Sequence, residues 1–169
     1  TPAIPQWVPR HLWEGLHFED IIASAKVWIP LIRERERPDL LVVLMHSGLE
    51  NDNPDYLENA GRALGEGVPG IDLLLIGHDH RKELEWLHPR GTADSVLLIN
   101  PANHLDRVSD IQITVKKRGG VVVSKELRPT FISLEGVEPD PAFLARFAPE
   151  RKAVEAYLGS EVGTLEAPV

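Results

Sequence analysis

Two short apolar runs, each followed within two residues by histidine, stand out in the hydrophobic pattern of the chain. The first run, residues 40–45, leads into His46-Ser47-Gly48. The second, residues 71–76, is apolar apart from Asp72 and leads into Gly77-His78-Asp79-His80. An apolar run of this length is typical of a strand that is buried on both faces of a sheet. A helix predicted over 56–64 completes a β-loop-α-β unit, which is long enough for one crossover between parallel strands.

The remaining pattern predicts a mixed sheet with further helices, so the expected fold class is α/β, with a mixed α+β sheet. The first 17 residues show no clear period and are expected to be irregular. The other predicted elements are a helix over 18–36 with a kink or break at Pro30, a strand over 96–99, a hairpin over 111–127 that turns at Gly119-Gly120, and a helix over 141–158 that is bent near Pro149.

Composition narrows the function classes. The formal net charge of -8 argues against a protein that binds a nucleic-acid polymer, because such a protein normally carries a basic face. No apolar run approaches the roughly 20 residues of a membrane span, so no membrane partner is expected. The chain has no cysteine, which excludes disulfides and thiolate metal ligands. It begins with Thr1 rather than methionine, and we expect it to start within a longer polypeptide.

The histidines after the two apolar runs are candidate metal ligands. Parallel strands joined by one crossover end at the same edge of a sheet, so His46 and His78 are expected on neighbouring loops. His78 and His80 are two residues apart, and their side chains should diverge in an extended loop, which suits two adjacent ions. Neutral imidazole is a common ligand of Zn, Mn, Fe and similar divalent ions.

Two other interpretations of these histidines stay open. Three histidines alone would also fit a mononuclear zinc site, and each one could simply be a turn residue with backbone hydrogen bonds. Their occurrence after both apolar strands favours metal binding. His104 follows the strand predicted over 96–99 and is a candidate for a catalytic role, in which it faces the substrate or lies in the second layer around the ions. Asp79 and Asn103 are further candidates for this second layer.

The motifs His46-Ser47-Gly48 and Gly77-His78-Asp79-His80 resemble the late metal-ligand motifs of the calcineurin-like metallophosphoesterases, specifically the 5'-nucleotidase branch. Residues 1–7 are similar to a segment of the bacterial 2',3'-cyclic-nucleotide 2'-phosphodiesterase/3'-nucleotidases within that branch. Residues 140–157 and Val162-Gly163-Thr164 resemble the helix and strand that lead to a second domain in these enzymes.

The resemblance implies a four-layer αββα sandwich with two divalent ions, of which residues 1–158 would form the C-terminal half and residues 159–169 a linker. His46 and His78 would bind one ion and His80 the other. The parent protein would hydrolyse a nucleotide or another phosphoester, as a 5'-nucleotidase or a 2',3'-cyclic-nucleotide phosphodiesterase/3'-nucleotidase, in the periplasm or outside the cell. The family's earlier Asp-x-His and Gly-Asn-His motifs do not occur in this chain.

These missing ligands lead to an expectation for the isolated chain. Without the bridging carboxylate it should have negligible activity, and an uncovered sheet face should promote a homodimer or assembly with the missing N-terminal half. One alternative is a non-catalytic half-domain or remnant that acts by assembly with another chain. Another alternative is a mononuclear metal hydrolase that is complete in itself.

Overall fold

The computed structural model describes residues 4–50 and 58–163. The chain divides into two compact units, Thr1–Glu135 and Gly136–Val169. The division at residue 158 follows from the resemblance rather than from compactness, and it stays a prediction. None of the helices in the described part of the chain is both long and apolar enough to cross a membrane.

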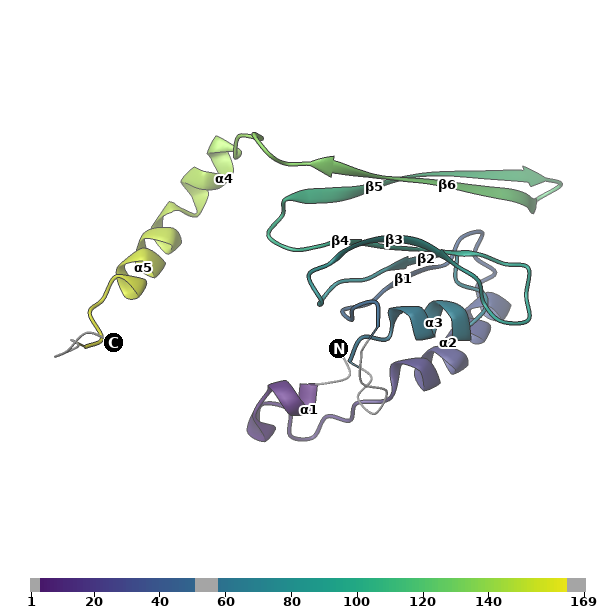
Figure 1. Ribbon diagram of the computed structural model, residues 1–169, viewed down its shortest axis with the longest axis horizontal. Helices are drawn as coiled ribbons and strands as arrows, with labels where there is room; N and C mark the ends of the chain where they lie inside the picture. Colours follow the sequence, from purple (N-terminus) through teal and green to yellow (C-terminus); the bar gives the residue numbers. More distant parts are fainter. Residues whose placement is uncertain (1–3, 51–57, 164–169) are drawn as a thin grey trace. The chain divides into compact units, whose positions relative to one another are not determined.

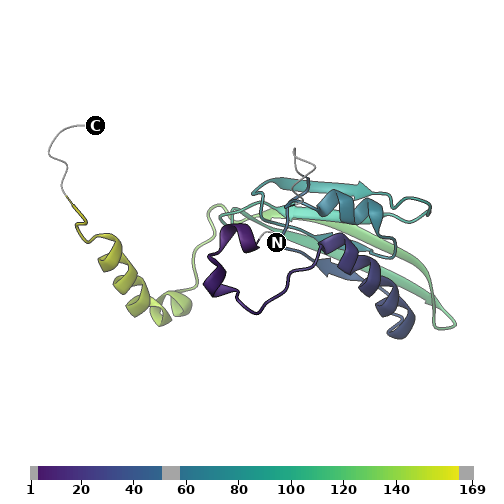
Figure 2. The ribbon, with the colours of Figure 1, turned by 90° about the horizontal axis from the view of Figure 1, so that it is seen from below.

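The first unit is built from three layers (Figure 1). Its central four-stranded sheet has the order β1-β2-β4-β3, with β1, β2 and β4 parallel and β3 antiparallel to β4. The helices α2 (Ile21–Arg35) and α3 (Gly61–Gly67) lie against one face, as Figure 2 also shows, and the β5-β6 hairpin lies against the other. The elements are α1 (Ile4–Trp7), a 3-10 helix (Arg10–Leu12), α2 (Ile21–Arg35), β1 (Val42–Leu44), α3 (Gly61–Gly67), β2 (Leu73–Leu75), β3 (Lys82–Leu87), β4 (Val96–Pro101), β5 (Arg107–Arg118) and β6 (Val121–Ser133).

The predicted mixed α/β class is therefore confirmed, and helices, sheet and hairpin supply three of the four expected layers. Alternate residues of β2 and β4 face the two sides of the sheet. Leu74 and Leu98 pack with the helices, whereas Leu73 and Leu97 pack with the hairpin. All four side chains are buried, because both faces of these central strands are covered.

The prediction that residues 40–45 are buried on both faces is wrong. β1 is an edge strand that pairs, among the described strands, only with β2. Val42 is 46% exposed and Leu44 is 84% exposed, while Val43 packs against the helical face. The hairpin that buries the corresponding side of β2 therefore leaves this side of β1 uncovered.

Two predicted helices differ from the observed ones in detail. α2 begins at Ile21, because the Asp20 carboxylate accepts a hydrogen bond from the Ala23 amide (2.7 Å), and it continues without a break through Pro30. α3 begins at Gly61 rather than at residue 56, although residues 56 and 57 lie outside the described part. The start of α3 depends on the loop after β1, as described below.

The second unit contains α4 (Pro141–Arg146) and α5 (Ala148–Leu158). The Asp140 carboxylate caps α4 by accepting hydrogen bonds from the amides of Ala142 and Phe143. The predicted helix over 141–158 is divided at Phe147 instead of being bent at Pro149, because proline is favoured in the first turn of a helix and starts α5 there.

Candidate metal centre

His46 and His78 meet at the carboxyl edge of the sheet, as the topology predicts. β1 and β2 pair in parallel, with Val42 opposite Leu73, so the loops that follow them leave the sheet side by side. The His46 Nε2 and His78 Nδ1 atoms are 3.2 Å apart, and the two ring centroids are 5.0 Å apart. Residues separated by about thirty positions in the sequence thus form one imidazole pair.

The backbone of the loop after β2 adopts an unusual conformation. His78 has φ of +83° and His80 has φ of +60°, values that non-glycine residues rarely adopt. The loop after β4 also contains left-handed residues, among them His104 with φ of +59°. Such conformations cost free energy and persist where surrounding contacts hold them, often at functional sites.

Asp79 supplies contacts that hold the loop after β2. Its Oδ2 accepts a hydrogen bond from the Leu49 amide (2.9 Å), and its Oδ1 accepts one from the Asn100 side-chain amide (2.7 Å). Asn100 is completely buried at the end of β4, and its Oδ1 accepts a hydrogen bond from the Ala102 amide. Asp79 and Asn100 therefore connect the loops that follow β1, β2 and β4.

The loop after β1 is tied to the start of α3 in a similar way. The buried Ser47 hydroxyl accepts a hydrogen bond from the Ala60 amide (2.8 Å) and donates one to the Glu58 carbonyl (2.6 Å). The Gly61 amide donates to the Gly48 carbonyl (2.9 Å). These groups satisfy amides that precede and begin the helix, so α3 starts without a capping side chain at Ala60.

Glu58 is a site residue that the sequence pattern did not indicate. Its Oε1 atom lies 2.6 Å from His78 Nε2 and accepts a hydrogen bond of 2.7 Å from the Trp7 indole. No periodicity or spacing marks Glu58, because it lies between a polar loop and a helix whose start depends on tertiary contacts.

The remaining predicted residues lie at the same edge without joining this pair. His80 is exposed, and the described residues include no hydrogen bond between it and His46 or His78. His104 and Asn103 lie in the loop after β4, where His104 is exposed and Asn103 is half-buried. Their predicted roles stay predictions.

The donor atoms of the pair fit a divalent ion, although the described residues contain no ready group of three or more His, Cys, Asp or Glu side chains that could hold one. Two nitrogens at about 2.0–2.1 Å from one tetrahedral ion are about 3.4 Å apart. The observed separation of 3.2 Å between His46 Nε2 and His78 Nδ1 is close to that value. The pair could therefore supply two ligands, and a complete site would need more.

The electrostatic surroundings of His46 favour its neutral form. Partial burial and the neighbouring imidazoles of His78 and His80 lower the pKa of His46 below its usual value. All of these effects disfavour the protonated ring. Since a metal ion binds the neutral imidazole, the surroundings favour the ligand form of His46.

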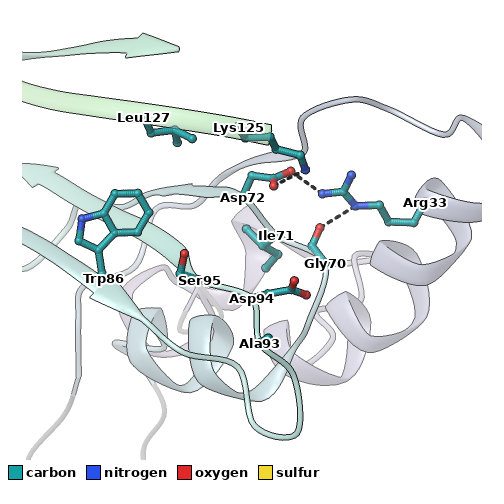
Figure 3. Close-up of a pocket in the computed structure, with 10 residues that line it drawn as sticks. All are labelled: Arg33, Gly70, Ile71, Asp72, Trp86, Ala93, Asp94, Ser95, Lys125 and Leu127. Carbon is teal, nitrogen blue, oxygen red and sulfur yellow. Dashed lines mark hydrogen bonds and ion pairs between the residues drawn. The ribbon is translucent and has the colours of Figure 1, made fainter. Parts of the chain in front are cut away.

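A cavity lies at the amino ends of β2 and β4, opposite the edge that carries the histidine pair (Figure 3). None of the described histidines lines this cavity. Its volume is about 460 Å³, and its wall includes Trp86 and Asp94. The Asp72 carboxylate lies between the Lys125 ammonium and the Arg33 guanidinium, each 2.5 Å away. The Asp72 carboxylate is thus paired with both cations, and we propose no ligand or reaction for this cavity.

Comparison with known proteins supports the resemblance that the motifs suggested. No family model matches the chain. The chain is 35% identical over 80 residues to the 2',3'-cyclic-nucleotide 2'-phosphodiesterase/3'-nucleotidase of Yersinia enterocolitica, a match covering 47% of this chain and 12% of that protein. It is 32% identical over 128 residues to the trifunctional nucleotide phosphoesterase protein YfkN of Bacillus subtilis, covering 70% of this chain and 9% of that protein. The matches thus span only a small part of these curated relatives.

Solved structures show the same fold. The calcineurin-like phosphoesterase YfkN from Bacillus subtilis superposes with a TM-score of 0.74 at 21% identity, over 94% of this chain and 51% of that chain. The 5'-nucleotidase precursor from Thermus thermophilus gives a TM-score of 0.61 at 16% identity, over 86% of this chain and 29% of that chain. These relatives and this shared fold support the calcineurin-like phosphoesterases as the family to which the chain is related.

Proposed function

We propose that this chain is part of a metal-dependent phosphoesterase that hydrolyses nucleotides, of the 2',3'-cyclic-nucleotide phosphodiesterase/3'-nucleotidase or 5'-nucleotidase type. The facing nitrogens of His46 and His78 carry this proposal, because they form a ligand pair at the carboxyl edge of a parallel sheet. The names of the relatives supply the substrate class. A periplasmic or secreted location of the parent protein is proposed from the resemblance alone.

Each residue has a distinct part in the proposal. His46 and His78 hold one divalent ion, and His80 reaches toward a second ion whose other ligands come from outside residues 1–169. A bound divalent ion polarises phosphoryl oxygens and lowers the pKa of water. Asp79 and Asn100 connect the ligand loops through hydrogen bonds, His104 is proposed to face the phosphoester, and Asn103 is proposed to belong to the second layer around the ions.

Metal titration of the purified protein tests the proposal. Residues 1–169 are expected to bind Zn²⁺ or Mn²⁺, and His46→Ala or His78→Ala should weaken binding by at least about tenfold, the lower end of what loss of an outer partner alone costs. Calorimetry measures the affinity, and elemental analysis measures the number of ions per chain.

The exposed His11 provides the matched control, because it lies in the 3-10 helix and His11→Ala should leave the affinity unchanged. Hydrolysis of 2',3'-cyclic AMP by residues 1–169 should be negligible, since the ligand set is incomplete. Absence of metal binding would contradict the proposed site, and rapid hydrolysis by this chain alone would contradict its role as one part of the catalytic unit.

The uncovered edge of β1 favours a second candidate function, in which the chain is a half-domain that acts by assembly with another chain. Leu44 is 84% exposed and lines an apolar groove between β1 and α2, together with Phe18, Trp28 and Met45. An edge strand with exposed apolar side chains is a template for pairing with a further strand.

Light scattering during size-exclusion chromatography tests this second candidate. The wild-type chain is expected to self-associate in the absence of a complementary polypeptide, and Leu44→Glu should shift it toward the monomer. Val121→Glu is the control, since Val121 is 67% exposed but lies at the turn of the hairpin. A wild-type chain that stays monomeric at high concentration would argue against assembly through β1.

A further inference from the structure

The carboxylate of Glu58 lies between two ring nitrogens. Its Oε1 atom is 2.7 Å from Trp7 Nε1 and 2.6 Å from His78 Nε2. We propose that Glu58 is a positioning residue that fixes the tautomer and orientation of His78, and that Trp7 orients Glu58 in turn. This inference rests on the proposed metal site, to which it adds two residues.

The chemistry of the three groups determines which ring nitrogen carries the proton. The Trp7 indole N–H can only donate, and an ionised carboxylate can only accept. The shared Oε1 atom of Glu58 therefore accepts from both sides, and His78 Nε2 must carry a hydrogen. In the neutral imidazole of His78 the other nitrogen, Nδ1, is then unprotonated.

The unprotonated nitrogen is the one that faces His46. His78 Nδ1 is 3.2 Å from His46 Nε2, so Glu58 directs the lone pair of His78 toward the atom with which it would share an ion. Histidine ligands of metals commonly donate their second N–H to a carboxylate, which sets the tautomer and raises the basicity of the ligand. Glu58 has this relation to His78.

Burial and backbone contacts make Glu58 suitable for this role. Its side chain is 13% exposed and that of His78 is 24% exposed, so water has limited access to their hydrogen bond. The Glu58 carbonyl accepts a hydrogen bond from the hydroxyl of Ser47, which follows His46 directly. Glu58 is thus fixed by its main chain to one ligand loop and by its side chain to the other.

Nuclear magnetic resonance of the metal-free protein tests the tautomer without reference to activity. Long-range ¹H–¹⁵N correlation spectra above neutral pH should show His78 with a protonated Nε2 and an unprotonated Nδ1, assigned by comparison with His78→Ala. In Glu58→Ala this preference should be lost, whereas Glu58→Gln keeps an acceptor oxygen and should retain it. A wild-type His78 that is protonated on Nδ1 would overturn the inference.

Metal titration provides the second readout. Glu58→Ala should bind Zn²⁺ about 10- to 100-fold more weakly than the wild type, the range observed for loss of an outer carboxylate partner. Trp7→Phe, which removes the indole donor to Glu58 but keeps an aromatic ring, should give a smaller loss. Glu50→Ala is the matched control for charge, because the 53%-exposed Glu50 carboxylate pairs with Arg62 rather than with a histidine.

The outcomes separate this inference from the proposed function. If the wild type and folded Glu58→Ala bind Zn²⁺ equally well, Glu58 has no positioning role. The inference about Glu58 is then wrong, while the proposed metal site stands. If the wild type binds no Zn²⁺ at all, the proposed metal site fails, and the tautomer measurement still decides whether Glu58 orients His78. Glu58→Gln, which preserves size and hydrogen bonding, shows whether any loss in Glu58→Ala reflects misfolding.

Discussion

Replacing Gly48 by alanine is expected to lower the free energy of unfolding by about 3 kcal/mol, at the upper end of the usual range for overpacking. A Cβ atom on Gly48 would lie 2.5 Å from Asp79 Oδ2, 2.6 Å from Asp79 Cβ and 2.6 Å from Asn59 Oδ1. These atoms belong to the contacts that connect the ligand loops, so they cannot move away without breaking hydrogen bonds. Urea denaturation followed by circular dichroism measures the change.

Gly77 is the matched control for this substitution, since it occupies the loop after β2. A Cβ atom on Gly77 would meet no heavy atom within 4 Å, so Gly77→Ala should have little effect on stability. Zn²⁺ affinity should fall in Gly48→Ala and stay near the wild-type value in Gly77→Ala. Equal stabilities of the two variants would show that the loop after β1 adapts more easily than its contacts indicate.

Replacing Asp72 by alanine is expected to cost about 2 kcal/mol of stability, between the roughly 0–1 kcal/mol of an exposed ion pair and the roughly 3–5 kcal/mol of a buried one, because these pairs are partly buried. The Asp72 side chain is only 15% exposed, and its carboxylate accepts hydrogen bonds from the side chains of Arg33 and Lys125 and from the Leu41 amide. Arg33 lies in α2 and Lys125 in β6, so the substitution leaves both cations without this partner and loosens the helix and the hairpin from the sheet.

Asp39→Ala is the control, because Asp39 forms an exposed ion pair with Lys117. The side chain of Asp39 is 46% exposed and that of Lys117 is 45% exposed. An exposed pair of this kind contributes about 0–1 kcal/mol, so the control should remain close to the wild type in urea denaturation at neutral pH. A cost for Asp72→Ala no larger than that for Asp39→Ala would contradict a central role of Asp72 in joining the layers.

The effect of Asp72 should also depend on pH. Burial by itself would raise the pKa of Asp72, but hydrogen bonds from Lys125, the Leu41 amide and Arg33 outweigh it and lower the pKa. The contribution of the carboxylate to stability is therefore fully present above the unfolded pKa of about 3.9, and it is lost as the pH falls through the lower folded pKa. The difference between wild type and Asp72→Ala should shrink below about pH 4.

Local patterns in the sequence determined several elements of the fold. Gly119 and Gly120, with φ of +57° and +81°, form the turn of the hairpin where the sequence predicted it. Apolar runs predicted the buried strands β2 and β4, because a strand covered on both faces contains hydrophobic residues at successive positions. Parallel topology then placed His46 and His78 at one edge.

Tertiary structure decided the features that depend on distant contacts. The apolar run of β1 is as hydrophobic as that of β2, yet its edge position leaves Leu44 exposed. β3 was not predicted at all, since the Lys82–Leu87 segment carries as many charged as apolar side chains and its pairing with β4 defines it. The late start of α3 likewise follows from hydrogen bonds to the loop after β1.

The same distinction applies to the candidate site. Which histidines follow the strands is a property of the sequence, because strand ends coincide with the ends of apolar runs. The ring nitrogen that His78 directs toward His46, and the contact of Glu58 with both Trp7 and His78, arise only when segments about 20 to 50 residues apart come together. Side-chain orientation depends on partners that no local pattern specifies, and only the folded chain defines them.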